Sequence, residues 1–196
     1  GTLIPVGPVD TAGFTLTLDG SATKQFKGAV TGGGTILVNG GSFKMTNPGA
    51  VATGSAVIVS GANINYDTAA GAPSAPRTAS LMLNGGSVNV GGISGSDTVE
   101  TNLNALTIGT NAGVSTITIT PNAAKNACFY SGSLVRNTGG ILHTRGTSLG
   151  LNTLASLTPN SANMVFGAAP ALFGAGGGAG STTNSILLGV YGDTSA

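Results

Sequence analysis

Few residues of this chain could carry acid–base or nucleophilic chemistry. The single histidine, His143, lies in an alternating segment that is expected to be a strand. A serine nucleophile would need a sharp strand-to-helix turn, and segment 91–97 comes nearest to that motif but lacks its pattern. The single cysteine, Cys128, has small and apolar neighbours, which favours an inert buried thiol; an intermolecular disulfide is the alternative. We therefore predict no catalytic residue.

The acidic residues include only one pair that is close in the sequence. Asp97 and Glu100 stand near each other in an expected loop. β-Helical enzymes that degrade polysaccharides need clustered carboxylates and cations in a groove, and calcium sites usually collect several carboxylates. The glycine-rich stretch 174–180 lacks the Gly-Lys-Ser/Thr ending of a phosphate loop. We expect neither a metal site nor a cofactor.

Composition excludes further classes of protein. The 196 residues include 34 glycines and 8 prolines, which leave no room for a helical bundle. The chain has seven Lys and Arg residues and six Asp and Glu residues. Seven scattered cations are too few to bind a run of phosphates, so nucleic acid is not an expected partner. The chain has no uninterrupted apolar run of about 20 residues, so no membrane span is predicted. The length suggests one domain, and the first residue, Gly1, indicates a processed product or an excerpt of a longer polypeptide.

The elements that would position any site are repeated strands. Segment 35–45 has the pattern apolar-x-apolar-polar-Gly-Gly-x-apolar-x-apolar, and segment 80–90 matches it position by position. Segment 56–66 is a third copy, and looser copies occur near 14–20, 106–109 and 134–143. Alternation with a period of two predicts strands with one buried face. The glycines at the centre permit the positive φ of a sharp turn.

A recurrence of about 20 to 25 residues is the length of one winding of a β-solenoid. We predict an all-β, right-handed parallel β-helix of about six or seven coils over residues 1–148, with a series of hairpins as the competing arrangement. Equivalent residues of successive coils would then stack in the interior. The predicted interior ladders are Ile36, Val57 and Leu81; Val38, Val59 and Leu83; and Phe43, Ile64 and Val88.

One row departs from clean alternation. Leu37, Ile58 and Met82 are apolar although they occupy the outward position in three successive copies. An exposed apolar row needs cover. Either a later segment of the chain packs over it, with 149–157 and 162–166 as the candidates, or it is a lateral interface with another chain.

The repeat is lost in the tail, residues 149–196. Leucine spacing over 149–157 allows a short helix that would end at Pro159. Segments 164–166 and 172–173 have the character of short strands, and 185–191 that of a closing strand. We expect the tail to be irregular and to pack on or close the solenoid within the same domain.

The two best copies, Ile36–Met45 and Leu81–Val90, resemble the autotransporter-associated β-strand repeat. Segment 132–141 and the residues after it look like units of very long bacterial surface and fibre proteins. The likeness covers residues 14–146 well and the tail less well. It implies an exported right-handed β-helix used as a stalk for adhesion or display, with no catalysis by the repeat itself.

The leading functional hypothesis is a structural segment of an extracellular bacterial filament or stalk that propagates by end-to-end stacking. Its partners would be copies of itself or neighbouring repeats of the same protein. An adhesive or glycan-binding surface module is the alternative, although the chain has no Trp and only three Tyr for stacking on sugars. A β-helical polysaccharide-degrading enzyme is the third hypothesis, and the first two place the protein at the bacterial cell surface.

Overall fold

Alternating apolar and polar residues form strands throughout the part of the chain that the structure describes. The computed structural model describes residues 2–46, 52–68, 71–110, 113–150, 159–172 and 187–193, with the backbone alone for 52–55. These residues form sixteen strands and no helix. Accordingly, no helix within those ranges is long and apolar enough to cross a membrane.

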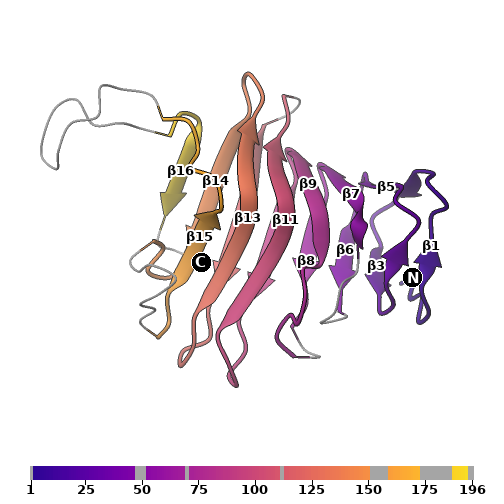
Figure 1. The fold of residues 1–196 in the computed structure, drawn as a ribbon, viewed down its shortest axis with the longest axis horizontal. Coiled ribbons are helices and arrows are strands. Elements are labelled where there is room, and N and C mark those ends of the chain that lie inside the picture. The colour runs from indigo at the N-terminus through magenta and orange to yellow at the C-terminus, as the bar shows by residue number, and fades with distance from the viewer. Residues whose placement is uncertain are drawn as a thin grey trace, which may run out of the picture.

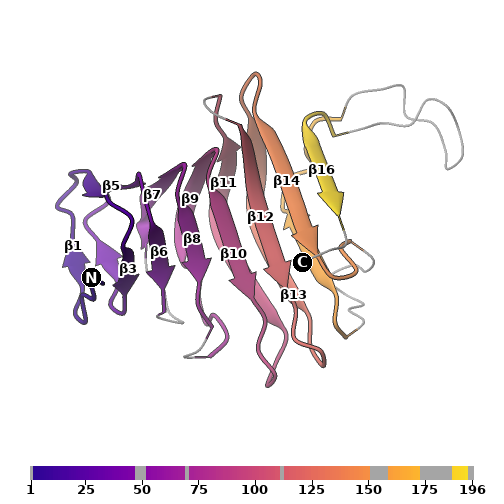
Figure 2. The same cartoon turned by 180° about the vertical axis from the view of Figure 1, so that it is seen from behind.

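Most strands lie in two long parallel sheets of seven strands each. One sheet contains, in spatial order, β16 (Val190–Asp193), β14 (Ile141–Gly146), β12 (Val114–Thr120), β10 (Ser87–Gly91), β8 (Asn63–Tyr66), β6 (Ser42–Met45) and β3 (Thr23–Phe26). The other contains β15 (Ala162–Phe166), β13 (Ala127–Arg136), β11 (Thr98–Ile108), β9 (Thr78–Asn84), β7 (Ala52–Ser60), β5 (Thr35–Val38) and β2 (Leu16–Leu18). A third, short sheet pairs β1 (Val9–Asp10) with β4 (Val30–Thr31). Both long sheets run along the long axis of the molecule, and the sheet of β13, β11 and β9 lies in front in Figure 1 and the sheet of β14, β12 and β10 in Figure 2.

The order of the strands shows how the chain winds. From β5 onward, successive strands of the chain belong alternately to the two long sheets. All pairings between named strands are parallel. The chain therefore passes from one sheet to the other and returns one strand further along the axis. The predicted all-β parallel β-solenoid is confirmed, and adjacent Asn-Gly-Gly arms do not fold back as antiparallel hairpins. The stack makes about five turns, slightly fewer than the six or seven coils expected from the sequence.

The turn between the two sheets depends on glycine. In the first copy Gly41 has a φ of 64°, in the left-handed region that side chains disfavour. A Cβ at this position would clash with the carbonyl oxygen of Ala22, in the winding below. The glycine is thus required both by its conformation and by the close approach of the neighbouring winding.

The long strands β11 and β13 each have two parts. Thr98–Asn102 pairs with Ala127–Ser131, and pairing resumes at Ala105 after a register shift. A bulge of this kind bends a strand, so one strand covers two sides of the winding. At the bulge Leu103 and Asn104 are exposed, whereas the residues before and after these two alternate between buried and half-buried.

A buried polar ladder crosses the windings beside this bend. Thr78 Oγ1 donates to Asn102 Oδ1 at 3.1 Å, and Asn102 Nδ2 donates to Ser131 Oγ at 2.9 Å. The Tyr66 hydroxyl extends the ladder to Thr78 Oγ1 at 3.1 Å. These bonds satisfy polar groups that would otherwise be costly to bury.

The tail continues both sheets. β15 adds a strand beside β13, and β16 adds one beside β14. Segment 162–166 is therefore an edge strand in the winding and does not cover the row of Leu37, Ile58 and Met82. Of the helix expected over 149–157, residues 151–157 lie outside the described part of the chain.

Candidate functional site

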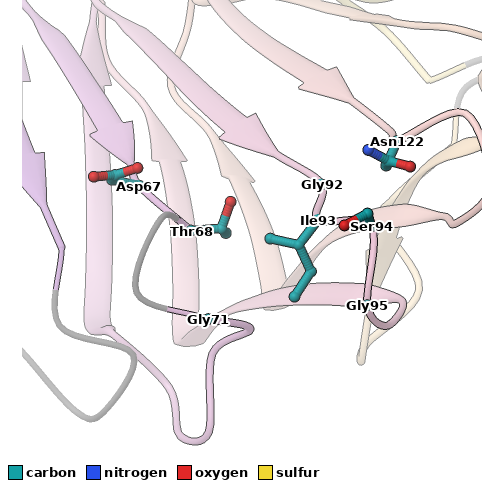
Figure 3. Close-up of a pocket in the computed structure, with 8 residues that line it drawn as sticks. All are labelled: Asp67, Thr68, Gly71, Gly92, Ile93, Ser94, Gly95 and Asn122. Carbon is teal, nitrogen blue, oxygen red and sulfur yellow. The ribbon is translucent and has the colours of Figure 1, made fainter.

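A groove lies where strands β8, β10 and β12 end (Figure 3). Its volume is about 540 Å³. It is lined by Asp67, Thr68, Gly71, Gly92, Ile93, Ser94, Gly95 and Asn122. Because parallel strands end at the same edge of a sheet, the segments after them meet here. In Figure 3 Asp67 and Thr68 lie on one side of Ile93, and Ser94 and Asn122 on the other.

The groove offers hydrogen bonds but little charge. Asp67 is the only lining residue with a carboxylate, and that carboxylate pairs with Lys44 Nζ at 2.9 Å. Thr68 Oγ1 donates to the carbonyl oxygen of Gly91 at 3.0 Å. No lining residue is aromatic, so a sugar ring would find no stacking partner among them. The arrangement can hold a small polar group, and it lacks the pair of carboxylates that glycoside hydrolysis needs.

A buried ion pair lies inside the winding and reaches the rim of this groove. Arg77 and Glu100 are both completely buried, and Arg77 Nε donates to Glu100 Oε2 at 2.9 Å. Arg77 Nη2 donates to the same oxygen. Arg77 Nη1 donates to the carbonyl oxygens of Asp67 at 2.8 Å and Met45 at 3.0 Å. One guanidinium therefore connects residues from β6, from the end of β8 and from β11.

Aromatic rings surround this pair. The guanidinium carbon of Arg77 lies 5.2 Å from the ring centroid of Tyr66. The ring centroids of Tyr66 and Phe129 are 6.3 Å apart. The apolar surroundings give the ion pair little solvation, and among the described residues Glu100 Oε1 has no hydrogen-bond partner.

Burial dominates the titration of this cluster. Loss of hydration raises the pKa of Glu100 to about 7, although the hydrogen bonds and charge of Arg77 oppose that rise. Loss of hydration also raises the pKa of the Tyr66 hydroxyl, and the charge of Glu100 adds to the rise. The protonated carboxyl is thus favoured in the folded protein over the unfolded one.

This shift predicts how stability depends on pH. Because the folded-state pKa of Glu100 is raised from 4.5 to about 7, the folded state binds more protons between these values. The contribution of Glu100 to stability is full below about pH 4.5 and is lost as the pH rises through about 7, a change of at most about 3 kcal/mol. Urea unfolding at a series of pH values measures it. The same profile for Glu100→Gln should be flatter in this window, and an equal slope in both proteins would contradict the assignment.

The sequence-based prediction for Glu100 is wrong. The sequence predicts Asp97 and Glu100 together in a loop, but Glu100 lies in β11 with its side chain inside the winding. Asp97 is exposed, and its Oδ1 accepts from the backbone N–H of Asn126 at 2.9 Å. The carboxylate of Asp97 therefore lies at the surface, whereas that of Glu100 is buried. In the described residues no group of three or more His, Cys, Asp or Glu side chains could hold a metal ion.

His143 lies on β14, as the sequence predicts, and contacts the last strand. Its Nε2 lies 2.8 Å from Asp193 Oδ2, and its ring stacks on Tyr191 with centroids 4.4 Å apart. Arg145 Nε donates to Asp193 Oδ1 at 3.3 Å. No serine shares a hydrogen bond with this histidine among the contacts of the described residues, so these groups attach β16 to β14.

Cys128 lies on β13 and is completely buried. Burial raises the pKa of its thiol to about 11. The thiolate, which is the reactive form, is therefore scarce at neutral pH.

The structure brings the residues of each expected interior ladder into register. Ile36 pairs with Val57 and Val57 with Leu81, Val38 pairs with Val59 and Val59 with Leu83, and Phe43 pairs with Ile64 and Ile64 with Val88. All nine side chains are buried. The outward row of Leu37, Ile58 and Met82 is in register as well, and each of its side chains is half-buried.

Sequence reasoning missed one residue of the third ladder. The position below Phe43 is held by Lys24, whose side chain is only 5 % exposed. Its Nζ donates to the carbonyl oxygens of Gly20 at 2.6 Å and Gly40 at 3.0 Å. At the other end of the same ladder stands Thr144, whose Oγ1 donates to the carbonyl oxygen of Tyr191 at 3.3 Å. Polar side chains thus stand on both sides of the apolar part of this ladder; beyond them Lys24 bridges to Leu3 and Thr144 pairs with Gly192.

Neither a protein-family model nor a curated protein or a solved structure matches this chain. The fold and the chemistry of its surfaces are therefore what point to a function.

Proposed function

We propose that the chain is a structural segment of an extracellular bacterial filament or stalk. In this role the solenoid propagates by end-to-end stacking, either within a longer polypeptide or between subunits. The support is physical: each winding hydrogen-bonds to the next along two seven-stranded sheets, and the buried ladders continue from winding to winding. The fold is a rod whose interior can be extended by repetition.

The observation that carries the proposal is the exposure of large apolar side chains at both extremities. β1 and β16 lie at opposite ends of the long axis (Figure 1). Near the first strands Val6 is 74 % exposed and Phe14 is 76 % exposed. Near the last strands Leu172 is 58 % exposed and Leu188 is 42 % exposed. Exposed apolar surface at open sheet ends is typical of a surface that another strand covers.

The charges of the chain do not oppose such contacts. Only 7 % of the residues are charged, and the net charge is +1. Electrostatic repulsion between copies is therefore weak at any separation. Along the outward row of Leu37, Ile58 and Met82 the same weak repulsion would allow side-by-side packing as well.

Electron microscopy and sedimentation velocity of the purified chain at increasing concentration test the proposal. We expect rods that lengthen with concentration in steps of about 30–35 Å, since seven parallel strands span about that distance. A monodisperse monomer at high concentration would overturn stacking between subunits.

A further inference from the structure

We infer that the outer face of the sheet of β5, β7 and β9 is a face-to-face interface with a second copy of this chain, in which the two rods run parallel about a two-fold axis. This inference rests on the proposed function and adds which surface pairs two rods and in what orientation. Two rows of outward side chains form the interface. One is the outward row of Leu37, Ile58 and Met82, and the other, the small row, consists of Thr35, Ala56 and Ser80.

The first argument is the continuity of the two rows. Both extend past β9, because Thr107 of β11 pairs with Met82 and Ala105 stands two residues before Thr107. The side chains of both rows are half-buried, so each keeps part of its surface exposed. Rows on parallel strands repeat about every 4.8 Å. The surface is therefore a regular stripe along the rod rather than a set of isolated apolar residues.

The second argument is charge. The residues of β2, β5, β7 and β9 include no charged side chain. The outer face of the other long sheet differs, since Lys44 of β6 and Arg145 of β14 lie on it. A charged partner would lose hydration on the uncharged face without gaining an ion pair. The face therefore fits a partner surface that is equally uncharged, and the same face of a second copy meets this requirement.

The third argument is the difference in size between the rows. The rows are two residues apart, about 7 Å. A two-fold axis that runs along the rod between them exchanges the rows, so that Met82 of each copy lies on Ser80 of the other, and Ile58 lies on Ala56. Large side chains then fill the space that small ones leave, as close packing requires. A two-fold axis along the strands would instead place large on large. Size thus selects parallel rods.

The area of the face explains why rods should pair rather than single chains. Four strands span about 19 Å, and the two rows with their side chains span about 14 Å, so one copy contributes only about 300 Å². Stable complexes usually bury about 1,200 Å² or more in total. End-to-end stacking adds the same area with every copy, so pairing strengthens as the rods grow.

Opposite charges placed in the two rows test the interface and its orientation. Met82→Lys and Ser80→Glu each put an unpaired charge into the contact, and each should lower the fraction of paired rods in electron micrographs about tenfold. When rods of the two variants are mixed, the introduced ammonium meets the introduced carboxylate, and pairing should return. The matched control is Asn89→Lys, which puts the same charge on the outer face of the other long sheet and should leave pairing unchanged.

The outcomes separate the interface from the proposed function. Unmodified rods that stay single would overturn the interface and leave end-to-end stacking intact. Equal losses of pairing in Met82→Lys and Asn89→Lys would also overturn it, and failure of the mixture to pair would overturn the parallel two-fold arrangement. If the unmodified chain forms no rods, stacking between subunits fails, and sedimentation equilibrium at the highest soluble concentration decides on the interface. A dimer that Met82→Lys abolishes and Asn89→Lys retains would support it, whereas a monomer would rule it out.

Discussion

Replacing Arg77 by methionine is expected to lower the free energy of unfolding by about 3–5 kcal/mol. Methionine fills much of the same volume but cannot donate hydrogen bonds. The carboxyl of Glu100 and the carbonyl oxygens of Met45 and Asp67 would then be buried without the donor that now serves all three. Urea unfolding followed by circular dichroism at pH 8 measures the loss. At that pH Glu100 is ionised in the unmodified protein, so loss of the Arg77 cation lowers the free energy of unfolding most.

Two controls show whether the loss comes from the buried position. Lys44→Met removes the cation of an ion pair whose lysine side chain is 32 % exposed, and it should cost about 1 kcal/mol or less. Adding Glu100→Leu to Arg77→Met removes the stranded carboxyl and should restore part of the lost stability. If Arg77→Met costs no more than Lys44→Met, the guanidinium does not hold the windings together.

The repeated strands could be predicted because their determinants are local. A period of two decides which side chains point inward, and the glycines fix where each winding turns. Once Ile36 and Leu81 occupy equivalent positions in two copies, stacking of windings places them in one ladder. No long-range information is needed beyond the offset between copies.

The inward-facing charged residues could not be predicted in this way. Arg77, Glu100 and Lys24 each bond to a partner in another winding. Those partners are 16 residues away in the sequence for Lys24 with Gly40, 23 for Arg77 with Glu100 and 32 for Arg77 with Met45. A charged residue in an alternating segment looks like a solvated one until the partner is known. The raised pKa of Glu100 has the same cause, because it follows from a burial that the sequence pattern does not reveal.

The groove and the arrangement of the tail could not be predicted from the repeat pattern either. Asp67, Ser94 and Asn122 line the groove from three segments that follow different strands and share no motif. Their convergence follows from the register of β8, β10 and β12. In the tail β15 ends at Phe166 and β16 begins at Val190, so the spacing of these strands no longer follows the period of the earlier windings.

Lysine at two consecutive positions should give opposite results. Leu81→Lys is expected to abolish folding, because Leu81 is 1 % exposed inside the winding and an unpaired ammonium there costs more than about 4–5 kcal/mol. Met82→Lys should remain folded with a change of about 1 kcal/mol or less. Met82 faces outward and is half-buried, so a long side chain there can extend its charge into water. Circular dichroism and urea unfolding of the two variants measure the difference.

The same pair decides what covers the row of Leu37, Ile58 and Met82. β15 lies at the edge of the sheet, so the described tail does not supply that cover. If the row is a lateral interface, Met82→Lys leaves single rods intact but prevents their side-by-side association in electron micrographs, because a charge is then introduced into an apolar contact. Unfolding of Met82→Lys to the extent of Leu81→Lys would show instead that the row is buried within one copy, and the lateral interface would be excluded.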